Sequence, residues 1–332
     1  MATRNARDIR YSIVVPVFNE EAVLPILLRR LDALMDRLDG PAEAILVDDG
    51  SSDSSSIVMR ARAKDDPRYR YIGLTRNFGH QIAITAGMDA ASGAAVIVMD
   101  ADLQDPPEVV EQMIAQWKAG YDVVHARRLS RDGEGVFKRA TASFFYKLLG
   151  RLSSVEIPAD VGDFRLVDRR VVERFRAMPE QDRFVRGMFA WLGFRQTSVD
   201  FHRPPRLAGT TKYPFWKMLR LAVNAVIGFS DAPLRAAIWA GLTVSGLAML
   251  YGLYVIGLWL AHSSLVEGWS STIIVISFLC GMNMLMTGII GLYIGRIYAE
   301  VKRRPLYVVE QRAGFDAVET AGAEPDTRTR VA

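Results

Sequence analysis

Residues 11–21 read YSIVVPVFNEE, an apolar, β-branched run that passes abruptly into an amide and two acids. The apolar part, residues 11–17, is typical of a buried strand. Helical apolar spacing follows over residues 20–38 and stops at Gly40-Pro41, where a helix is expected to end. The alternation continues, with expected strands at 44–48, 69–74, 94–99 and 123–126 and expected helices at 54–64, 80–91 and 106–119. It predicts an α/β domain whose mostly parallel sheet is covered by helices.

Acidic side chains gather where three of the expected strands end. The first strand passes into FNEE (18–21), the second into DDGSSD (48–53) and the fourth into DADLQD (100–105). Parallel sheets bind ligands beyond the carboxyl ends of their strands, so we expect the site there. Asp100 and Asp102 can approach a hard divalent ion such as Mg²⁺ or Mn²⁺ from one turn. The DDGSSD segment taken singly is equally consistent with a solvated turn.

Composition excludes several other classes of protein. Half of the 332 residues are hydrophobic, and Cys280 is the single cysteine, which leaves no disulfide framework and no cysteine metal cluster. The four histidines, at 80, 125, 202 and 262, show no paired ligand spacing, so we expect ordinary loop or packing residues. No G-x-G-x-x-G or P-loop motif follows a strand, which argues against a dinucleotide enzyme or an NTPase.

The net charge of +4 conceals three differently charged segments. Residues 1–122 carry 13 basic and 19 acidic side chains, residues 123–235 carry 21 and 11, and residues 236–332 carry seven of each. A basic segment of this kind suits nucleic acid, a membrane surface or a phosphate-bearing substrate. The apolar sequence that follows favours an anionic membrane leaflet and phosphate-bearing lipids over nucleic acid.

Two charge-free stretches, residues 236–261 and 268–295, each exceed the roughly 20 residues that cross a bilayer core. They predict a membrane hairpin rather than two buried core helices. Basic residues such as Arg235 and Arg296 flank the hairpin, whereas its short connection contains one acid. The positive-inside rule therefore predicts a multi-pass inner-membrane protein with its catalytic domain and both termini in the cytoplasm. No apolar signal segment precedes the first strand, so export of that domain is not expected.

Two further segments mix aromatic and basic side chains. Residues 136–152 and 214–229 alternate Phe, Leu or Trp with Lys and Arg, and we expect amphipathic helices that lie in the membrane interface or pack on the sheet. The expected layout is a catalytic domain over 1–210, an amphipathic interface region over 211–235, a two-helix membrane hairpin with a basic cytoplasmic end over 236–310, and a disordered tail over 311–332.

Taken as a set, these motifs resemble glycosyltransferase family 2. The shared segments are VPVFNEE (15–21), VDDGSSD (47–53), RNFGH (76–80) and DADLQDPPE (100–108). Other segments resemble its polyprenyl-phosphate glycosyltransferase branch, which includes bactoprenol glucosyltransferases and aminoarabinose-phosphate transferases and is akin to dolichyl-phosphate-mannose synthases. They are KRATASFFY (138–146), DVGDFRLVDR (160–169), RFVRGMFAWLGFRQ (183–196), RLAGTTKY (206–213) and GRIYAEVKRRPLY (295–307). The resemblance implies a GT-A fold and inverting, metal-dependent transfer from a nucleotide-sugar donor.

The resemblance also implies roles for individual residues. The implied nucleotide contacts are Pro16, Phe18, Glu20, Val47, Asp48 and Asp49, and the implied donor-facing turn contains Asp100 and Ala101. Asp102 and Gln104 match the ligands of a Mg²⁺ or Mn²⁺ ion. The basic positions near the phosphates are matched by Arg127, Arg206 and Lys212, and the acceptor-phosphate positions by Lys138, Arg139 and Ser143. Asp163 matches a catalytic-site position, for which we expect a role in positioning the acceptor.

Four other charged residues have simpler interpretations. We expect Arg165 and Asp168 to pair with each other or with neighbours. Arg183 and Arg186 fit the site or a basic helix face equally well.

The implied reaction moves a sugar from a nucleotide sugar, UDP-glucose by preference, to the phosphate of undecaprenyl phosphate. The product would be a polyprenyl-phosphate sugar for cell-envelope glycan or lipid modification. UDP-N-acetylglucosamine, a uronic acid, an aminopentose and GDP-mannose remain open as donor sugars. The oligomeric state also remains open, and the resemblance is compatible with a homo-tetramer. The alternatives are a membrane-tethered nucleotide-sugar-binding scaffold without catalysis, or transfer to a non-polyprenyl acceptor. A processive polysaccharide synthase is disfavoured, since the chain contains no Q-x-x-R-W element.

Overall fold

A computed structural model describes residues 9–128, 161–202, 232–260 and 268–315. Its strands are β1 (Tyr11–Val17), β2 (Ala42–Asp48), β3 (Tyr69–Leu74), β4 (Ala95–Val98), β5 (Val123–Arg128), β6 (Val161–Asp168), β7 (Gln196–Phe201) and β8 (Val309–Ala313). Its helices are α1 (Leu24–Arg37), α2 (Ser55–Asp65), α3 (His80–Ala90), α4 (Val109–Lys118), α6 (Arg169–Arg176), α7 (Val185–Trp191), α9 (Ala232–Leu260) and α10 (Trp269–Lys302). Each strand and helix expected up to residue 128 is present.

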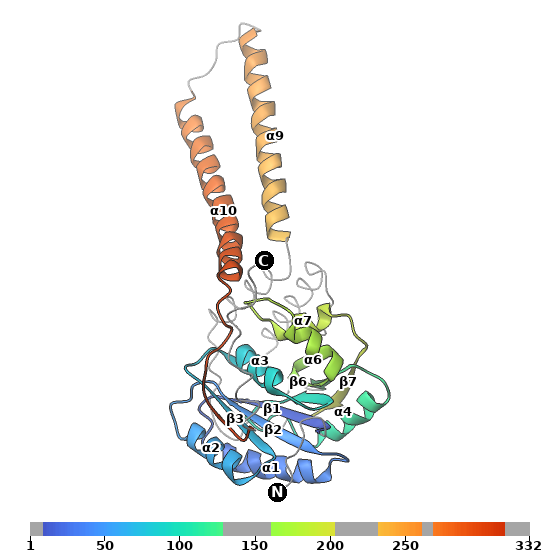
Figure 1. The fold of residues 1–332 in the computed structure, drawn as a ribbon. Coiled ribbons are helices and arrows are strands. Elements are labelled where there is room, and N and C mark those ends of the chain that lie inside the picture. The colour runs from blue at the N-terminus through green and yellow to red at the C-terminus, as the bar shows by residue number, and fades with distance from the viewer. Residues whose placement is uncertain (1–8, 129–160, 203–231, 261–267, 316–332) are drawn as a thin grey trace, which may run out of the picture. The chain divides into compact units, whose positions relative to one another are not determined.

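The strands form one sheet in the order β7-β5-β6-β4-β1-β2-β3-β8 (Figure 1). β1 pairs in parallel with β2 and β4, β2 pairs in parallel with β3, and β5 pairs in parallel with β7. β6 and β8 run in the opposite direction, because each pairs antiparallel with its neighbours. The expected α/β domain with a mostly parallel sheet is confirmed.

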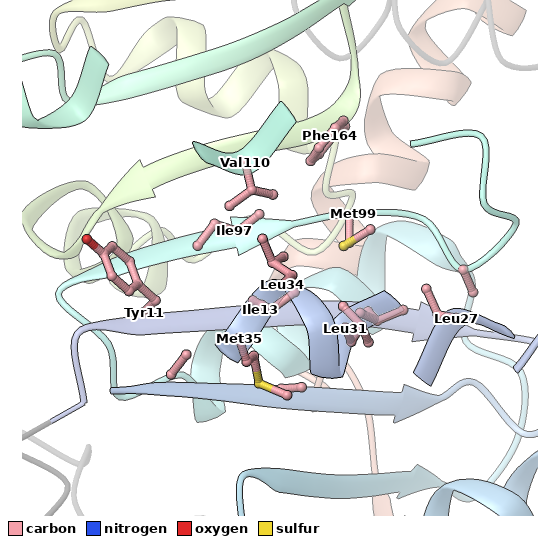
Figure 2. Close-up of a cluster of buried hydrophobic side chains, with 14 of the residues drawn as sticks. Tyr11, Ile13, Leu27, Leu31, Leu34, Met35, Ile97, Met99, Val110 and Phe164 are labelled. Carbon is pink, nitrogen blue, oxygen red and sulfur yellow. The ribbon is translucent and has the colours of Figure 1, made fainter. Parts of the chain in front are cut away.

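Helices cover both faces of this sheet. Alternate residues of a strand point to opposite faces, so Ile13 of β1 belongs to the core beneath α1, α2 and α4, and Val14 belongs to the core beneath α3, α6 and α7. Figure 2 shows the first core, where Leu27, Leu31 and Leu34 of α1 pack against the sheet at helical spacing. Each fully buried side chain of this kind contributes about 1.5–3 kcal/mol.

Helix α3 packs closely on the sheet at Gly87. A Cβ atom at this position would lie 2.2 Å from Val14 Cγ1 and 3.0 Å from Val47 Cγ2. Any larger residue would therefore push the helix outward. This close packing matters for the site, because α3 begins at the carboxyl edge of the sheet.

Two helices begin later than expected. α1 begins at Leu24 rather than residue 20. The Glu20 carbonyl accepts hydrogen bonds from Val23 and Leu24 in a preceding turn, and Pro25 has no N–H group to continue this pattern to Glu21. α4 begins at Val109 rather than residue 106, after a turn formed by Pro106 and Pro107. In both places the residues outside the helix lengthen the loop at the end of a strand.

The sheet also contains strands that the sequence analysis did not anticipate. β6 contains the whole GDFR motif (162–165), and its antiparallel direction brings its first residues to the carboxyl edge of β4. β8 follows α10 and pairs with β3. It crosses the expected boundary between residues 310 and 311, so residues 309–313 belong to the sheet and not to a membrane hairpin or a tail.

The chain divides into two compact units. The first comprises residues 1–141, 156–212 and 305–332, and the second comprises residues 142–155 and 213–304. In the second unit, α9 and α10 contain candidate membrane spans at Leu234–Tyr254 and Phe278–Lys302, neither of them buried inside the protein. Their length and apolar composition indicate membrane association.

Candidate active site

Two loops at the carboxyl edge of the sheet are hydrogen-bonded to each other. The Asn19 side chain accepts a hydrogen bond from Ser52 N (2.8 Å), and Asn19 N donates to Ser51 Oγ (3.0 Å). Glu20 N donates to Ser55 Oγ at 3.0 Å. Asn19 adopts a φ of 56°, a left-handed conformation that asparagine tolerates. The FNEE and DDGSSD segments therefore form one ordered wall, and the alternative of a simple solvated turn is not supported.

The carboxylates of Asp48 and Asp49 hold this wall to its neighbours. Asp48 accepts hydrogen bonds from Ser51 N (2.9 Å) and the Tyr71 hydroxyl (3.2 Å). Asp49 accepts them from the backbone of the next loop, at Phe78 N (2.7 Å) and Gly79 N (3.0 Å). Burial raises the pKa of Asp49 above its usual range, although the two N–H groups oppose this effect.

The other expected nucleotide-binding residues lie on the same wall. Pro16 and Val47 are buried partners in the β1–β2 pairing. Phe18 follows β1 with 46% of its surface exposed, which leaves a ring on which a base can stack. The structure thus brings together Pro16, Phe18, Glu20, Val47, Asp48 and Asp49.

The acidic turn after β4 is tightly folded. Asp102 Oδ1 accepts a hydrogen bond from Gln104 N (3.1 Å), and Asp105 Oδ2 accepts one from Asp100 N (3.0 Å). Leu103 lies between them, buried and with a φ of 59°. A branched side chain is strained in this conformation. Such strain persists where the surrounding structure imposes it and is common at functional sites.

The donor set of this turn fits a hard cation. Asp100 and Asp105 each have a buried Oδ1 atom that makes no hydrogen bond with any described residue. Burial, followed by the charge of Asp100, raises the pKa of Asp105 to about 7. No three His, Cys, Asp or Glu side chains form a ready-made metal site within the described part of the chain. Asp102 and Gln104 would therefore share an ion with substrate phosphates and water, which is the usual arrangement for Mg²⁺.

Asp163, at the start of β6, is a buried carboxylate that joins several elements. Its Oδ1 accepts a hydrogen bond from Arg186 Nε (2.9 Å), and its Oδ2 accepts one from Gln81 Nε2 (3.1 Å). Burial raises the pKa of Asp163, but contacts with His80 and Arg186 outweigh burial and hold it well below its usual range. Asp163 is therefore suited to positioning other groups rather than to accepting a proton. Arg186 contacts the site and is not simply part of a basic helix face.

His80 is a site residue that the sequence analysis missed. Its Nε2 atom lies 3.3 Å from Asp100 Oδ1 and 3.3 Å from Asp163 Oδ2. The His80 side chain is 45% exposed. Partial desolvation lowers the pKa of the imidazole, but the hydrogen bond to Asp163 and the charge of Asp100 more than offset this effect and raise the pKa to about 9. The expectation of an ordinary loop or packing residue did not include these contacts with Asp100 and Asp163. A usable signal was its place in the RNFGH motif, directly after a strand.

Arg127 and Arg128, at the end of β5, have different surroundings. Arg127 makes a bidentate pair with Asp200 of β7, with N–O distances of 2.6 and 2.9 Å. Arg128 lies beside Gly162. Burial raises the pKa of Asp100 and of Asp105, and the positive charge of Arg128 partly opposes this effect. We therefore add Arg128 to the candidate site, as a cation that faces the acidic turn. Adjacent strand residues point to opposite faces, so one arginine could not be distinguished from the other without the sheet.

The remaining charged pairs have local partners. Arg165 is buried and pairs with Asp163, whereas Asp168 accepts a hydrogen bond from Trp117 Nε1 at 2.7 Å. Arg165 and Asp168 therefore pair with neighbouring residues, which was one of the two arrangements expected for them. Arg183 is buried and donates to backbone carbonyl groups around the end of α6, so it is not part of a solvated basic face.

Several expected site residues lie outside the described residues. They are the acceptor-phosphate positions Lys138, Arg139 and Ser143, and the donor-loop positions Arg206 and Lys212. The expected amphipathic helices at 136–152 and 214–229 lie outside them as well.

Known proteins share this sequence along most of its length. Residues 12–176 match the family described as glycosyl transferase family 2. The uncharacterized glycosyltransferase YkcC of Bacillus subtilis (strain 168) is 49% identical over 311 residues, covering 94% of this chain and 96% of the relative. The SfII prophage-derived bactoprenol glucosyl transferase of Shigella flexneri is 40% identical over 302 residues, covering 91% of this chain and 98% of the relative.

A solved structure with some similarity to this chain is glucosyl-3-phosphoglycerate synthase from Mycobacterium tuberculosis, in complex with Mn²⁺, UDP-glucose and phosphoglyceric acid. It is 20% identical with a TM-score of 0.46, over 66% of this chain and 78% of that chain. Likeness at this level carries no conclusion about activity.

The sheet and the acidic turns at its carboxyl edge are those of a glycosyltransferase with the GT-A fold. The chain belongs to glycosyltransferase family 2.

Proposed function

We propose that this enzyme transfers glucose from UDP-glucose to the phosphate of undecaprenyl phosphate, with inversion at the anomeric carbon. The observation that carries the proposal is near-full-length similarity, at 40% identity, to proteins named bactoprenol glucosyl transferase. The acidic turn and the nucleotide wall supply the corresponding site. A role as a scaffold that binds donor without catalysis does not explain why this turn is strained and acidic.

The low pKa of the Asp163 carboxylate supports a phosphate acceptor. A phosphate monoester has a second pKa of about 6, so it is largely dianionic at neutral pH. Such a nucleophile needs no strong general base. Asp163 keeps its carboxylate bonded to His80 and Arg186, which hold its pKa well below the usual range, so it is poorly suited to act as a base.

The departing nucleoside diphosphate is the group that most needs stabilisation. Asp102 and Gln104 would hold Mg²⁺ or Mn²⁺, which supplies positive charge to the diphosphate oxygens when bound. Arg128 adds a fixed cation beside the acidic turn. By the resemblance, Arg206 and Lys212 cover the diphosphate. Attack from the side opposite the diphosphate would convert an α-linked donor into a β-linked product.

The apolar helices support a lipid acceptor. We propose that α9 and α10 form a hairpin across the inner membrane, with the catalytic unit and both termini in the cytoplasm. The outer flanks are basic and the short connection is not, which is the asymmetry of the positive-inside rule.

Asp102→Asn tests the reaction with little change in shape. Purified protein in detergent receives undecaprenyl phosphate, Mn²⁺ or Mg²⁺, and UDP-glucose with a radiolabelled sugar. Wild type should move label into the lipid fraction, and EDTA should prevent it. The variant should lose about 100-fold or more of the rate, as when one group that stabilises developing charge is removed.

Glu111→Gln is the matched control, because it neutralises an exposed acid on α4 that pairs with Arg37. It should keep the wild-type rate within about twofold, since exposed ion pairs contribute little to stability. Donor binding by wild type without any lipid label would contradict the proposal and favour the scaffold. Transfer of label from another nucleotide sugar, or to another acceptor, would show that the proposed donor or acceptor is wrong although the enzyme is a glycosyltransferase.

A further inference from the structure

We propose that His80 is a positioning residue that holds the carboxylates of Asp100 and Asp163 in the arrangement needed for transfer. The inference rests on the proposed function and goes beyond it, since neither the motifs nor the implied ligand set assigns His80 a role. One nitrogen, Nε2, lies 3.3 Å from an oxygen of each carboxylate. His80 thereby connects the acidic turn after β4 to the first residues of β6.

The imidazole is held in place from both sides. On one side, Asp49 accepts hydrogen bonds from Phe78 N and Gly79 N, which places the turn immediately before His80. On the other side, the next residue, Gln81, donates to Asp163 Oδ2 (3.1 Å) and accepts from Val185 N (3.1 Å). His80 is the first residue of α3, so its side chain starts from a fixed backbone.

The two carboxylates depend on His80 to different degrees. Asp163 also contacts Arg165 and Arg186. Asp100 has a buried Oδ1 atom that accepts no hydrogen bond from the described residues. The His80 nitrogen, 3.3 Å away, and the charge of Arg128 offset its burial. Two carboxylates brought together repel each other unless a cation lies between them. Without His80, we therefore expect the acidic turn to move away from Asp163.

This arrangement predicts a loss of rate rather than of nucleotide affinity. The wall that is expected to bind the nucleotide is tied together by Asn19, Ser51 and Ser52, which do not involve His80. The turn that carries Asp102 is the part that His80 fixes. A displacement of about 1 Å at reacting groups can cost about 10²-fold in rate.

The test compares His80→Ala and His80→Lys in the lipid-transfer assay, with Lys118→Ala as control. Lys118 pairs with Asp39 at the opposite edge of the sheet. His80→Ala should lower kcat about 10- to 100-fold, with the KM for UDP-glucose changed less than about threefold. His80→Lys restores a cation and should recover at least about fivefold of that loss. Lys118→Ala should match wild type in both constants.

Two outcomes would overturn the role. One is a His80→Ala enzyme with kcat within about threefold of wild type. The other is a variant that loses UDP binding, measured by calorimetry with Mn²⁺, in proportion to its activity. That second result would show a role in folding of the site as a whole and not in positioning.

A spectroscopic measurement separates this inference from the proposed function. Protein labelled with ¹⁵N-histidine should show His80 imidazole signals, assigned by their loss in His80→Ala. Asp100→Asn and Asp163→Asn should both shift these signals, whereas Glu111→Gln should not. If wild type transfers no glucose but the signals shift, the proposed reaction is contradicted, while the contacts of His80 with Asp100 and Asp163 are supported. If neither carboxylate variant shifts the signals, the positioning role of His80 is contradicted, whichever reaction the enzyme catalyses.

Discussion

At the scale of single residues, Asp49 shows how one side chain serves both the fold and the site. Its carboxylate accepts the backbone N–H groups of Phe78 and Gly79, and so places the start of α3. Gly50 follows it with a φ of +70°, and a Cβ there would lie 2.5 Å from the Arg76 carbonyl carbon. The turn can pass this close to the neighbouring loop only with glycine.

His125 of β5 is a buried histidine whose pKa affects the stability of the fold in mild acid. Its Nε2 lies 2.9 Å from Gln196 Oε1, and the Gln196 amide nitrogen donates to the Phe189 carbonyl. Its Nδ1 is buried without a hydrogen-bond partner among the described residues. Burial, and then the charge of Arg165, lowers the pKa of His125 to about 4. The folded protein therefore favours the neutral imidazole.

This shift predicts a loss of stability in mild acid. An unfolded histidine has a pKa of about 6.5, so the unfolded chain binds a proton before the folded one does. The contribution of His125 is fully present above pH ~6.5, declines as the pH falls, and is lost near pH 4. The difference in pKa corresponds to about 3 kcal/mol.

Thermal unfolding of wild type and His125→Asn, followed from pH 7.5 to 4.5, checks this prediction. Both proteins lose stability as carboxylates become protonated, and wild type should lose more. Parallel curves for the two proteins would show that His125 does not titrate as expected.

At the scale of elements, the segment after α10 is attached to the catalytic sheet. β8 extends the sheet beside β3, and the Tyr307 hydroxyl donates to Asp89 near the end of α3 (2.9 Å). Tyr307 also packs against the core beneath α3. The segment therefore contacts the same helix that carries His80 at its other end.

Tyr307→Phe should lower the free energy of unfolding of the catalytic unit by about 1 kcal/mol, the usual net contribution of one hydrogen bond. Tyr307→Ala should cost more, because it also removes the packed ring. The melting temperature in detergent measures both. Tyr298→Phe removes an exposed hydroxyl from α10 and should leave the melting temperature unchanged. Equal effects at the two tyrosines would rule out a specific contribution from Tyr307.

At the scale of the whole molecule, the exposed apolar surface of α9 and α10 is the feature that needs explanation. Large side chains such as Trp239, Leu250, Met284 and Ile297 are more than half exposed. Apolar patches of this extent are rare on soluble monomers. A bilayer would cover them, which is why we propose a hairpin.

Single-cysteine labelling tests the proposed orientation. Cys280→Ser removes the only cysteine, and Ser264→Cys or Ala317→Cys then adds one in the connection or after β8. A membrane-impermeant maleimide should label residue 264 in spheroplasts. It should label residue 317 only after lysis. The reverse pattern would contradict the orientation, and labelling of both in spheroplasts would contradict a hairpin.

The sequence was most informative where structure depends on neighbouring residues. β1 and β3 were predicted with their observed ends, because a short β-branched run bounded by turn residues has few alternatives. The three acidic loops were found because each directly follows a strand. β8 was missed, because a short edge strand without a strong apolar pattern becomes recognisable only beside its partner β3.

Local periodicity and motif spacing were therefore enough to locate the acidic turns and the strands and helices up to residue 128, since these depend on residues close together in the chain. The partners of the charged side chains in the site could be identified only from the tertiary structure. Asp163 reaches His80 and Arg186 because β6 runs antiparallel to β4 and its first residues return to the carboxyl edge of the sheet. Arg127 pairs with Asp200, whereas the charge of Arg128 acts on Asp100 and Asp105, because adjacent residues of β5 point to opposite faces. Such contacts depend on packing between distant segments, and local patterns carry little information about that packing.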